Sequence, residues 1–352
     1  MRVETIKNEF YPAEQDYPLN QWYVAAFSPE IEAGKLLRRM LLGTPVLLYR
    51  TEEGKPVALY DRCPHRGLPL SMGKQIGDRI QCGYHGIQFG PDGQCKHVPS
   101  QTGTPAALSV DSYPVVEKWQ WIWIWMGDPA KADESLLPDH EWMGLSVPDY
   151  TANIFTVKEI GCNYQFFNDN LLDATHLSYI HFGTLDTGGI AGAEFWIEEK
   201  DPYIIIGRTE PEVSYTGEIA RYFRAEEGKV YHRTHLTELL VPTTHVAKQW
   251  LRDVNDPDAP PLILYAINAL TPKDKRSTYT FHVQVSSYPD NCTERDLAGV
   301  HYILGEDVVA LEALQRDYEE IGDTREVSVS ADNAAVRARR MVKRLVEAEG
   351  GA

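Results

Sequence analysis

Two short stretches decide how the first part of the chain folds: CPHRG at residues 63–67 and CGYHG at residues 82–86. Each places a cysteine and a histidine in one glycine-containing loop, so two thiolates and two imidazoles can face one site. This donor set matches a [2Fe–2S] cluster in which Cys63 and Cys82 hold one iron while His65 and His85 hold the other. A Cys₂His₂ zinc site is the alternative, although zinc motifs more often show C-x-x-C with H-x₃₋₅-H.

The sequence around these loops is typical of a small all-β domain. From Trp22 to about Trp125, short β-type runs such as VLLYR and PVALY are separated by Gly, Pro and Asp. Tryptophan at every second position from Trp119 to Trp125 predicts a core strand. The following segment, GDPAKADESLLPDHEW, reads as a linker. We therefore predict two domains, 1–135 with an N-terminal extension and 136–352.

The second part of the chain combines strands with helices. Runs such as YIIIGRTE and YTFHVQVS predict strands, and residues 163–180, 294–319 and 332–348 predict helices. This order indicates an α+β fold and not alternating βαβ units. No glycine-rich dinucleotide or nucleoside triphosphate motif follows a strand. Electrons for any redox reaction must therefore come from another protein.

Bulk composition excludes several classes of partner. The net charge of −17 over 352 residues repels nucleic acid and anionic membrane surfaces. No apolar run approaches the ~18 residues that a spanning helix needs, so we expect a cytoplasmic protein. The five cysteines are scattered and odd in number, which argues against a disulfide framework. Cys95, Cys162 and Cys292 are expected to be small buried hydrophobic residues.

A second candidate metal site lies in residues 163–181, NYQFFNDNLLDATHLSYIH. On a helix, Asp173 and His176 share one face. His181 lies about 140° further round, so a regular helix would direct the two imidazoles apart. Both can bind one metal only if the helix loosens or ends near Tyr179. Such a pair still needs a carboxylate ligand.

The missing carboxylate is sought on the helix around GVHYILGEDVVALEALQRDY, residues 299–318. Asp307 falls on an apolar stripe, where an ionised carboxylate is costly unless it is paired or binds a cation. The other residues of this stripe are Val300, Leu304, Leu311, Leu314 and Tyr318. Glu306 and Glu312 fall off the stripe and are expected to be ordinary solvated residues. By periodicity alone, Asp307 at a wet edge of the stripe is the alternative.

These motifs resemble those of the Rieske non-haem iron oxygenases, in particular the oxygenase components of the vanillate and dicamba O-demethylase group. The resemblance runs from NQWYVAA at Asn20 to the last helix and includes Asn170-x-x-Asp173-x-x-His176-x₄-His181. It implies an N-terminal all-β Rieske [2Fe–2S] domain and a C-terminal helix-grip (START-like) catalytic domain with an antiparallel sheet. It also implies that His176, His181 and Asp307 bind a mononuclear Fe(II).

The resemblance further implies a homotrimer in which the cluster of one chain serves the iron of the next. Asp173 would then link His85 of one chain to His176 of its neighbour, with Asn170 part of the same catalytic motif. A separate NAD(P)H-dependent reductase, with or without a ferredoxin, would supply electrons. The cofactors would be the [2Fe–2S] cluster and the mononuclear iron.

The activity so implied is hydroxylation of a small aromatic substrate with O₂, as in aromatic compound catabolism. O-demethylation of a methoxylated aromatic acid with formaldehyde release is the leading hypothesis. His245 and Asn268 occupy positions that hold the substrate in this group, Asn268 in place of a histidine. N-demethylation, methyl hydroxylation and ring cis-dihydroxylation are the alternatives within the family. A non-catalytic zinc protein and an electron-transfer protein are the alternatives outside it.

Overall fold

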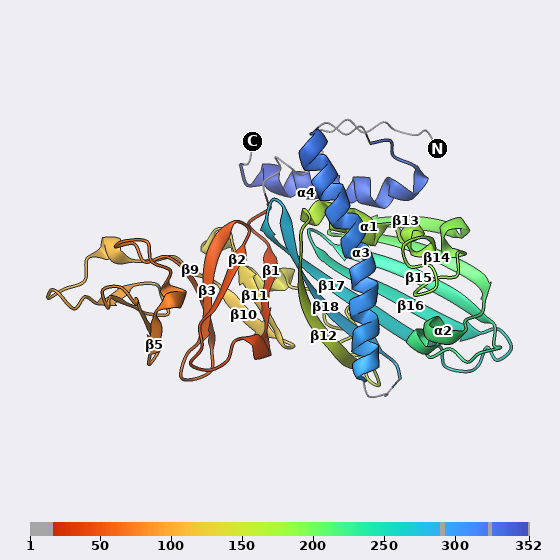
Figure 1. Cartoon of the computed structure of the whole chain (residues 1–352), viewed down its shortest axis with the longest axis horizontal. Coiled ribbons are helices and arrows are strands. Elements are labelled where there is room, and N and C mark those ends of the chain that lie inside the picture. The colour runs from red at the N-terminus through yellow and green to blue at the C-terminus, as the bar shows by residue number, and fades with distance from the viewer. Residues whose placement is uncertain (1–16, 289–292, 323–325, 351–352) are drawn as a thin grey trace. The chain divides into compact units, whose positions relative to one another are not determined.

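The computed structural model describes residues 17–288, 293–322 and 326–350. It contains two compact units (Figure 1): Tyr17–Leu137 with Thr271–Asp274, and a larger unit formed by Pro138–Leu270 and the described residues from Lys275 onward. Each unit is considered by itself. Within the described residues, no helix combines the length and apolar character needed to cross a membrane.

The smaller unit is all-β apart from short 3₁₀ turns, as predicted. It contains a three-stranded and two four-stranded antiparallel sheets, in the orders β1-β11-β10, β2-β3-β4-β9 and β5-β6-β7-β8. Their bounds are β1 Trp22–Phe27, β2 Leu37–Leu41, β3 Thr44–Arg50, β4 Pro56–Tyr60, β5 Lys74–Ile76, β6 Arg79–Gln81, β7 Gln88–Phe89, β8 Cys95–His97, β9 Ser112–Tyr113, β10 Val115–Lys118 and β11 Trp121–Trp125.

The tryptophan-rich strand begins two residues later than predicted. β11 is buried throughout and pairs with β1 from Trp125 to Trp121. Trp119 lies in the preceding turn, with φ of 59°, and 45% of its surface is exposed. The left-handed backbone there ends the β-type pattern, so Trp119 is not a core residue.

The larger unit contains a seven-stranded antiparallel sheet in the order β12-β18-β17-β16-β15-β14-β13. Helix α3 lies across one face of this sheet in Figure 1. This arrangement confirms the predicted α+β class with a helix packed on an antiparallel sheet. The bounds are β12 Thr151–Ile160, β13 Glu194–Lys200, β14 Tyr203–Val213, β15 Tyr231–Leu240, β16 Thr244–Asp253, β17 Leu262–Asp274, β18 Ser277–Ser286, α1 Tyr164–Leu172, α2 Gly217–Phe223, α3 Glu294–Ile321 and α4 Asn333–Ala348.

Helix α3 follows the predicted apolar stripe as far as Leu311, but Leu314 is 53% exposed and Gln315 is buried in its place. It begins at a capping box in which Thr293 and Asp296 satisfy each other's backbone amides, and it ends before Gly322, whose φ is 81°. Its buried residues recur at helical spacing, so one face of α3 packs against the protein. They are Val300, Leu304, Asp307, Leu311 and Gln315. Asp307 is thus a buried carboxylate and not one at a wet edge.

The predicted helix over residues 163–180 breaks earlier than Tyr179. α1 ends at Leu172, and a 3₁₀ helix, η7 (Ala174–Ser178), follows it. Asp173 has non-helical backbone angles, φ −110° and ψ 91°, and its carboxylate accepts the Thr175 N–H as the N-cap of η7. This break places His176 in the 3₁₀ turn and His181 beyond it.

Two of the three remaining cysteines match their prediction. Cys95 and Cys162 are buried. Cys292 lies outside the described residues.

Candidate metal centres and substrate cavity

The two cysteine–histidine loops of the smaller unit have matching local structure. The backbone N–H groups of Cys63 and Cys82 donate to Leu68 and Ile87, closing two tight loops. Gly67 and Gly86 take positive φ in these loops, of 79° and 71°, which glycine adopts readily. The two loops therefore close in the same way, although the histidine follows the cysteine by two residues in the first loop and by three in the second.

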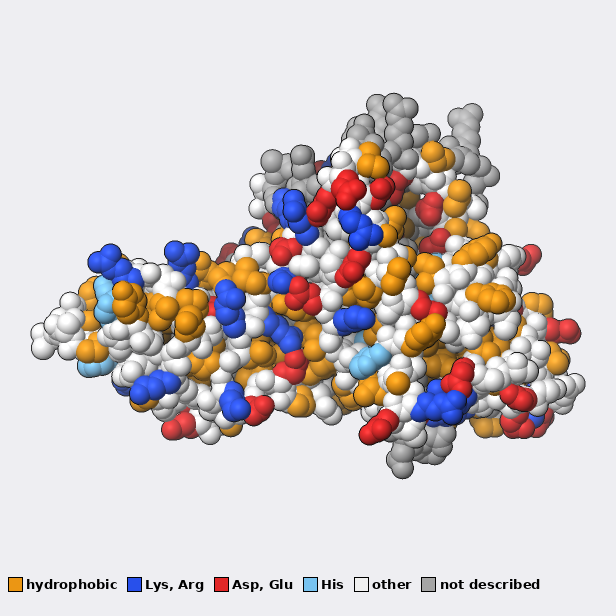
Figure 2. All heavy atoms as spheres, viewed as in Figure 1, with side chains coloured by type: hydrophobic (Ala, Val, Ile, Leu, Met, Phe, Trp, Pro, Cys, Tyr) orange, Lys and Arg blue, Asp and Glu red, His pale blue; other side chains and the backbone are white. Residues whose placement is uncertain are grey.

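The thiols and the imidazoles of these loops differ in exposure. Both cysteine side chains are buried at 2% exposure, whereas His65 and His85 are exposed, with ring centroids 4.6 Å apart. Burial, with a contribution from the neighbouring Cys82 thiol, raises the pKa of Cys63 to about 11. A free thiol there would stay protonated, and a metal would replace that proton. Figure 2 shows histidine and hydrophobic side chains together at the surface of this unit.

The four residues of the two loops lie together as two like pairs. The Cys63 and Cys82 thiols interact with each other, and the His65 and His85 rings are 4.6 Å apart. A [2Fe–2S] cluster divides two cysteines and two histidines between its two irons, so these residues fit the cluster.

The second candidate centre is formed by His176, His181 and Asp307 in the larger unit. Asp307 Oδ1 lies 3.1 Å from His181 Nε2 and 3.7 Å from His176 Nε2. His181 and Asp307 are only 1% and 5% exposed. The predicted triad is thus brought together, although its members come from a 3₁₀ turn, a loop and a distant helix.

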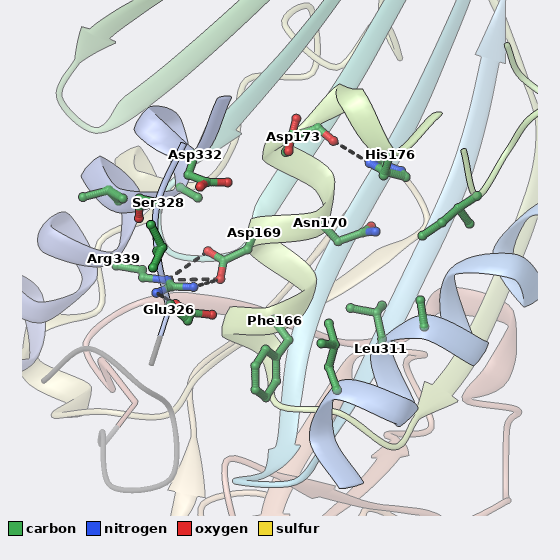
Figure 3. A pocket seen from close by; sticks show the side chains of 16 residues that line it. Phe166, Asp169, Asn170, Asp173, His176, Leu311, Glu326, Ser328, Asp332 and Arg339 are labelled. Carbon is green, nitrogen blue, oxygen red and sulfur yellow. Dashed lines mark hydrogen bonds and ion pairs between the residues drawn. The ribbon is translucent and has the colours of Figure 1, made fainter. Parts of the chain in front are cut away.

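The other nitrogen of each imidazole has an acceptor. His176 Nδ1 contacts the backbone carbonyl of Asp173, as Figure 3 shows. His181 Nδ1 lies 2.9 Å from Glu306 Oε2. Donation from both Nδ1 atoms leaves both Nε2 atoms as ligands directed toward Asp307.

Asn170 and Asp173 lie beside this centre. Asn170 Nδ2 donates to Asp307 Oδ1 over 3.2 Å, which orients the carboxylate. The Asp173 carboxylate accepts hydrogen bonds from the backbone N–H and the hydroxyl of Thr175. The contact to His176 Nδ1 is made by the backbone carbonyl of Asp173 and not by its carboxylate. The expected link from the Asp173 side chain to its own His176 is therefore not present in this arrangement.

The charges and pKa shifts of the triad residues are those of a site that could bind a cation. Burial lowers the pKa of His176. Burial also opposes charge on His181, but hydrogen bonds and charge from Asp307 and Glu306 outweigh it and raise its pKa. Two imidazoles and one carboxylate are the donor set of non-haem Fe(II) oxygenases, and they leave positions open for reactants. The residues therefore fit a mononuclear iron.

The expectation for Glu306 was wrong. It lies off the apolar stripe of α3, yet its carboxylate contacts His181, and its side chain is only 18% exposed. The loop that carries His181 covers this flank of the helix, a tertiary contact that helical periodicity does not encode. Glu312 instead accepts the backbone N–H of Gly161.

A cavity adjoins the triad and is lined by residues of the sheet and of α3. All three triad residues line it, together with the sheet residues His235, Thr237, Ala247, Gln249, Leu264, Ala266, Asn268 and His282 and the apolar residues Leu171, Ala174, Leu177, Leu185, Tyr222, Val300, Ile303 and Leu304. Asn268 is one of the two predicted substrate residues. His245 is not in this lining, because it lies under α1 with Nε2 2.8 Å from Asn168 Oδ1.

Sequence reasoning missed the other polar residues of the cavity. His235 and His282 are 5% and 4% exposed, and His235 Nδ1 and His282 Nε2 have no hydrogen-bond partner within the described structure. Gln249 lies on the next strand to His235, opposite it in register. Their sequence signal is that polar residues recur at alternate positions of the strands, which places them on one face of the sheet. That face is the one that packs against α3.

Comparison with known proteins agrees with this geometry. Residues 21–114 match the Rieske [2Fe-2S] domain, and residues 160–348 match the vanillate O-demethylase oxygenase C-terminal domain. The iron-sulfur subunit TsaM1 of the toluene-4-sulfonate monooxygenase system of Comamonas testosteroni is 32% identical, and the alignment covers 94% of this chain and 98% of that one. The oxygenase component of dicamba O-demethylase from Stenotrophomonas maltophilia is 33% identical, and the alignment again covers 94% of this chain and 98% of that one.

A solved structure extends the likeness to the fold. The crystal structure of dicamba monooxygenase bound to 3,6-dichlorosalicylic acid superposes with a TM-score of 0.86 at 30% identity, covering 96% of this chain and all of that one. The likeness therefore extends over both the Rieske-like and the C-terminal parts of the chain. The chain belongs to the Rieske non-haem iron oxygenases, as an oxygenase component of the group that contains the dicamba and vanillate O-demethylases.

Proposed function

We propose that this oxygenase component O-demethylates a small methoxylated aromatic acid and releases formaldehyde and a phenol. The observation that carries the proposal is that His176, His181 and Asp307 all line one cavity. The rest of its lining consists of apolar residues and of uncharged polar residues. When bound, the mononuclear iron supplies dioxygen activation, and the cluster supplies single electrons. One O₂, two electrons and two protons convert the methoxy group to a hemiacetal and water, and the hemiacetal collapses to the two products.

The cavity suits one substituted ring. It is small, about 90 Å³, and Leu177, Leu264 and Ile303 are among its apolar residues. Such walls bind an aromatic ring and exclude water from the reacting carbon. A single ring is therefore favoured over a polycyclic substrate.

The polar residues that the sheet contributes to the cavity, His235, Thr237, Gln249, Asn268 and His282, are uncharged. No lysine or arginine is among the described residues that line it. Burial lowers the pKa of His282 to about 4 and that of His235 well below its usual value, so both imidazoles are neutral at pH 7. Asn268 Oδ1 accepts from His282 Nδ1 over 2.9 Å, which leaves the Asn268 amide group to donate to a ligand. A substrate carboxylate would be held by such hydrogen bonds and not by a cation.

A second cavity gives access to His176 from another side. It measures about 340 Å³, and its lining includes Asp169, Asp173, His176 and Arg339. Figure 3 shows Asn170 and His176 pointing the same way from this segment, with Asp169 turned toward Arg339 on α4. His176 thus borders both cavities.

We propose that the chain forms a homotrimer in which the second cavity receives the surface around His85 of a neighbouring chain. The smaller unit presents an exposed His85 stacked on Tyr84, with ring centroids 3.9 Å apart and Tyr84 61% exposed. Asp173 would accept a hydrogen bond from the neighbour's His85. A separate NAD(P)H-dependent reductase would supply the electrons, since the chain carries no dinucleotide-binding motif.

The direct test is a screen of methoxybenzoates with O₂, NADH and a generic Rieske reductase. We expect formaldehyde and the corresponding phenol in equal amounts from at least one compound, because both come from one hemiacetal. An oxygenated product without formaldehyde would indicate methyl or ring hydroxylation instead.

The same assay tests the substrate role of Asn268. Asn268→Leu should raise KM for the active acid roughly 10- to 100-fold, since a hydrogen bond to a charged group is worth about 1.5–3 kcal/mol. The methyl ester of that acid should show a smaller difference between the variant and the wild type. Unchanged KM for the acid would remove Asn268 from the binding site.

A further inference from the structure

We propose that Glu306 is a positioning residue for the mononuclear metal centre, because it holds His181 in one tautomer and one orientation. The inference rests on the proposal that His181 binds iron together with His176 and Asp307. It does not depend on which substrate is oxidised.

Adjacent residues of α3 contact opposite edges of one imidazole. Glu306 Oε2 lies 2.9 Å from His181 Nδ1, and Asp307 Oδ1 lies 3.1 Å from His181 Nε2. The His181 ring is 1% exposed, so water does not replace either contact. The two carboxylates therefore set both the rotation of the ring and the nitrogen that faces the metal.

Glu306 also anchors the turn that follows His181. The Thr184 hydroxyl lies 2.9 Å from the same Glu306 oxygen and 3.0 Å from the backbone carbonyl of His181. The backbone N–H of Leu185 donates to that carbonyl over 2.9 Å. The carboxylate thus joins α3 to both the side chain and the backbone turn of one proposed ligand.

The chemical consequence is a directed ligand atom. An ionised carboxylate accepts only, so Nδ1 of His181 carries the proton and Nε2 keeps its lone pair for the metal. At His176 the same task falls to the backbone carbonyl of Asp173. That backbone contact cannot be removed by substitution, whereas the Glu306 contact can.

The test measures Fe(II) affinity of the full-length protein after the mononuclear site has been emptied with a chelator. Glu306→Ala should weaken Fe(II) binding roughly 10- to 100-fold, as expected for loss of a partner to a metal-bound histidine. Glu306→Gln should lose less, because its amide oxygen still accepts from Nδ1. The visible spectrum of the cluster should stay unchanged in both variants.

A matched control is Glu320→Gln, which removes one charge from an exposed position of α3. Wild-type affinity in Glu306→Ala, or an equal loss in Glu320→Gln, would overturn the proposal. If Glu306→Ala does not fold, Thr184→Val replaces it, and wild-type affinity in both Thr184→Val and Glu306→Gln would likewise overturn it. Normal iron binding by wild type without formaldehyde release would refute the proposed reaction and leave the role of Glu306 standing.

Discussion

Replacing Asp307 with alanine should lower the iron content from about three to about two atoms per chain without changing the visible spectrum. Asp307 is the carboxylate on which both imidazole Nε2 atoms converge, and it is only 5% exposed. Without it, two histidines remain, a set that binds Fe(II) weakly. The cluster ligands belong to the other compact unit, so the cluster should survive. Oxygenation should be abolished.

Iron and acid-labile sulfide, measured on the same sample, check this outcome. Asp317→Ala, at an exposed position of the same helix, is the control and should retain all its iron. Full iron content in Asp307→Ala would mean that another residue supplies the third ligand. The nearest alternatives in sequence are already engaged, since Asp169 pairs with Arg339 and Asp186 with Arg233.

Asp173→Asn should reduce turnover by orders of magnitude while both metal centres remain loaded. Asparagine caps a helix about as well as aspartate, so the Thr175 contact that starts η7 should persist and the fold should be spared. The substitution removes the charge that is proposed to accept a hydrogen bond from the neighbour's His85. An amide oxygen is a weaker acceptor than a carboxylate, so the link between centres should weaken.

The measurement is the rate at which the reduced protein loses its reduced visible spectrum in the presence of substrate and O₂. Asp317→Asn removes one charge from an exposed position of α3 outside this lining and should reoxidise at the wild-type rate. Rapid reoxidation and near wild-type turnover in Asp173→Asn, with the trimer intact, would remove Asp173 from the proposed electron path.

The parts of the site that sequence predicted are those set by local spacing. The two cysteine–histidine loops are short, and their ligands lie within a few residues of one another. Asp307 was accessible to the same reasoning because a carboxylate on an apolar stripe must be paired or bound. The position of the break in α1 was less accessible, since it depends on Asp173 capping two helices at once.

The parts that sequence missed are contacts between distant segments. Glu306 is off the buried stripe, and only the loop that carries His181 covers it. His245 and Gln249 project from the same face of β16, but α1 covers the first and the cavity receives the second. The alternation along a strand predicts which face of the sheet a side chain lies on. It does not predict whether a helix or a cavity covers that side chain, because this depends on how the helices pack over the sheet.

The most direct test of the account is a single turnover of chemically reduced, fully iron-loaded protein with an active methoxybenzoate and O₂, in the absence of reductase. The account predicts up to about one formaldehyde and one phenol per mononuclear iron, since the two centres together hold the two electrons needed. It also predicts no product from Asp307→Ala. Oxidation of the cluster without formaldehyde or any oxygenated product, in protein that holds both centres, would contradict it.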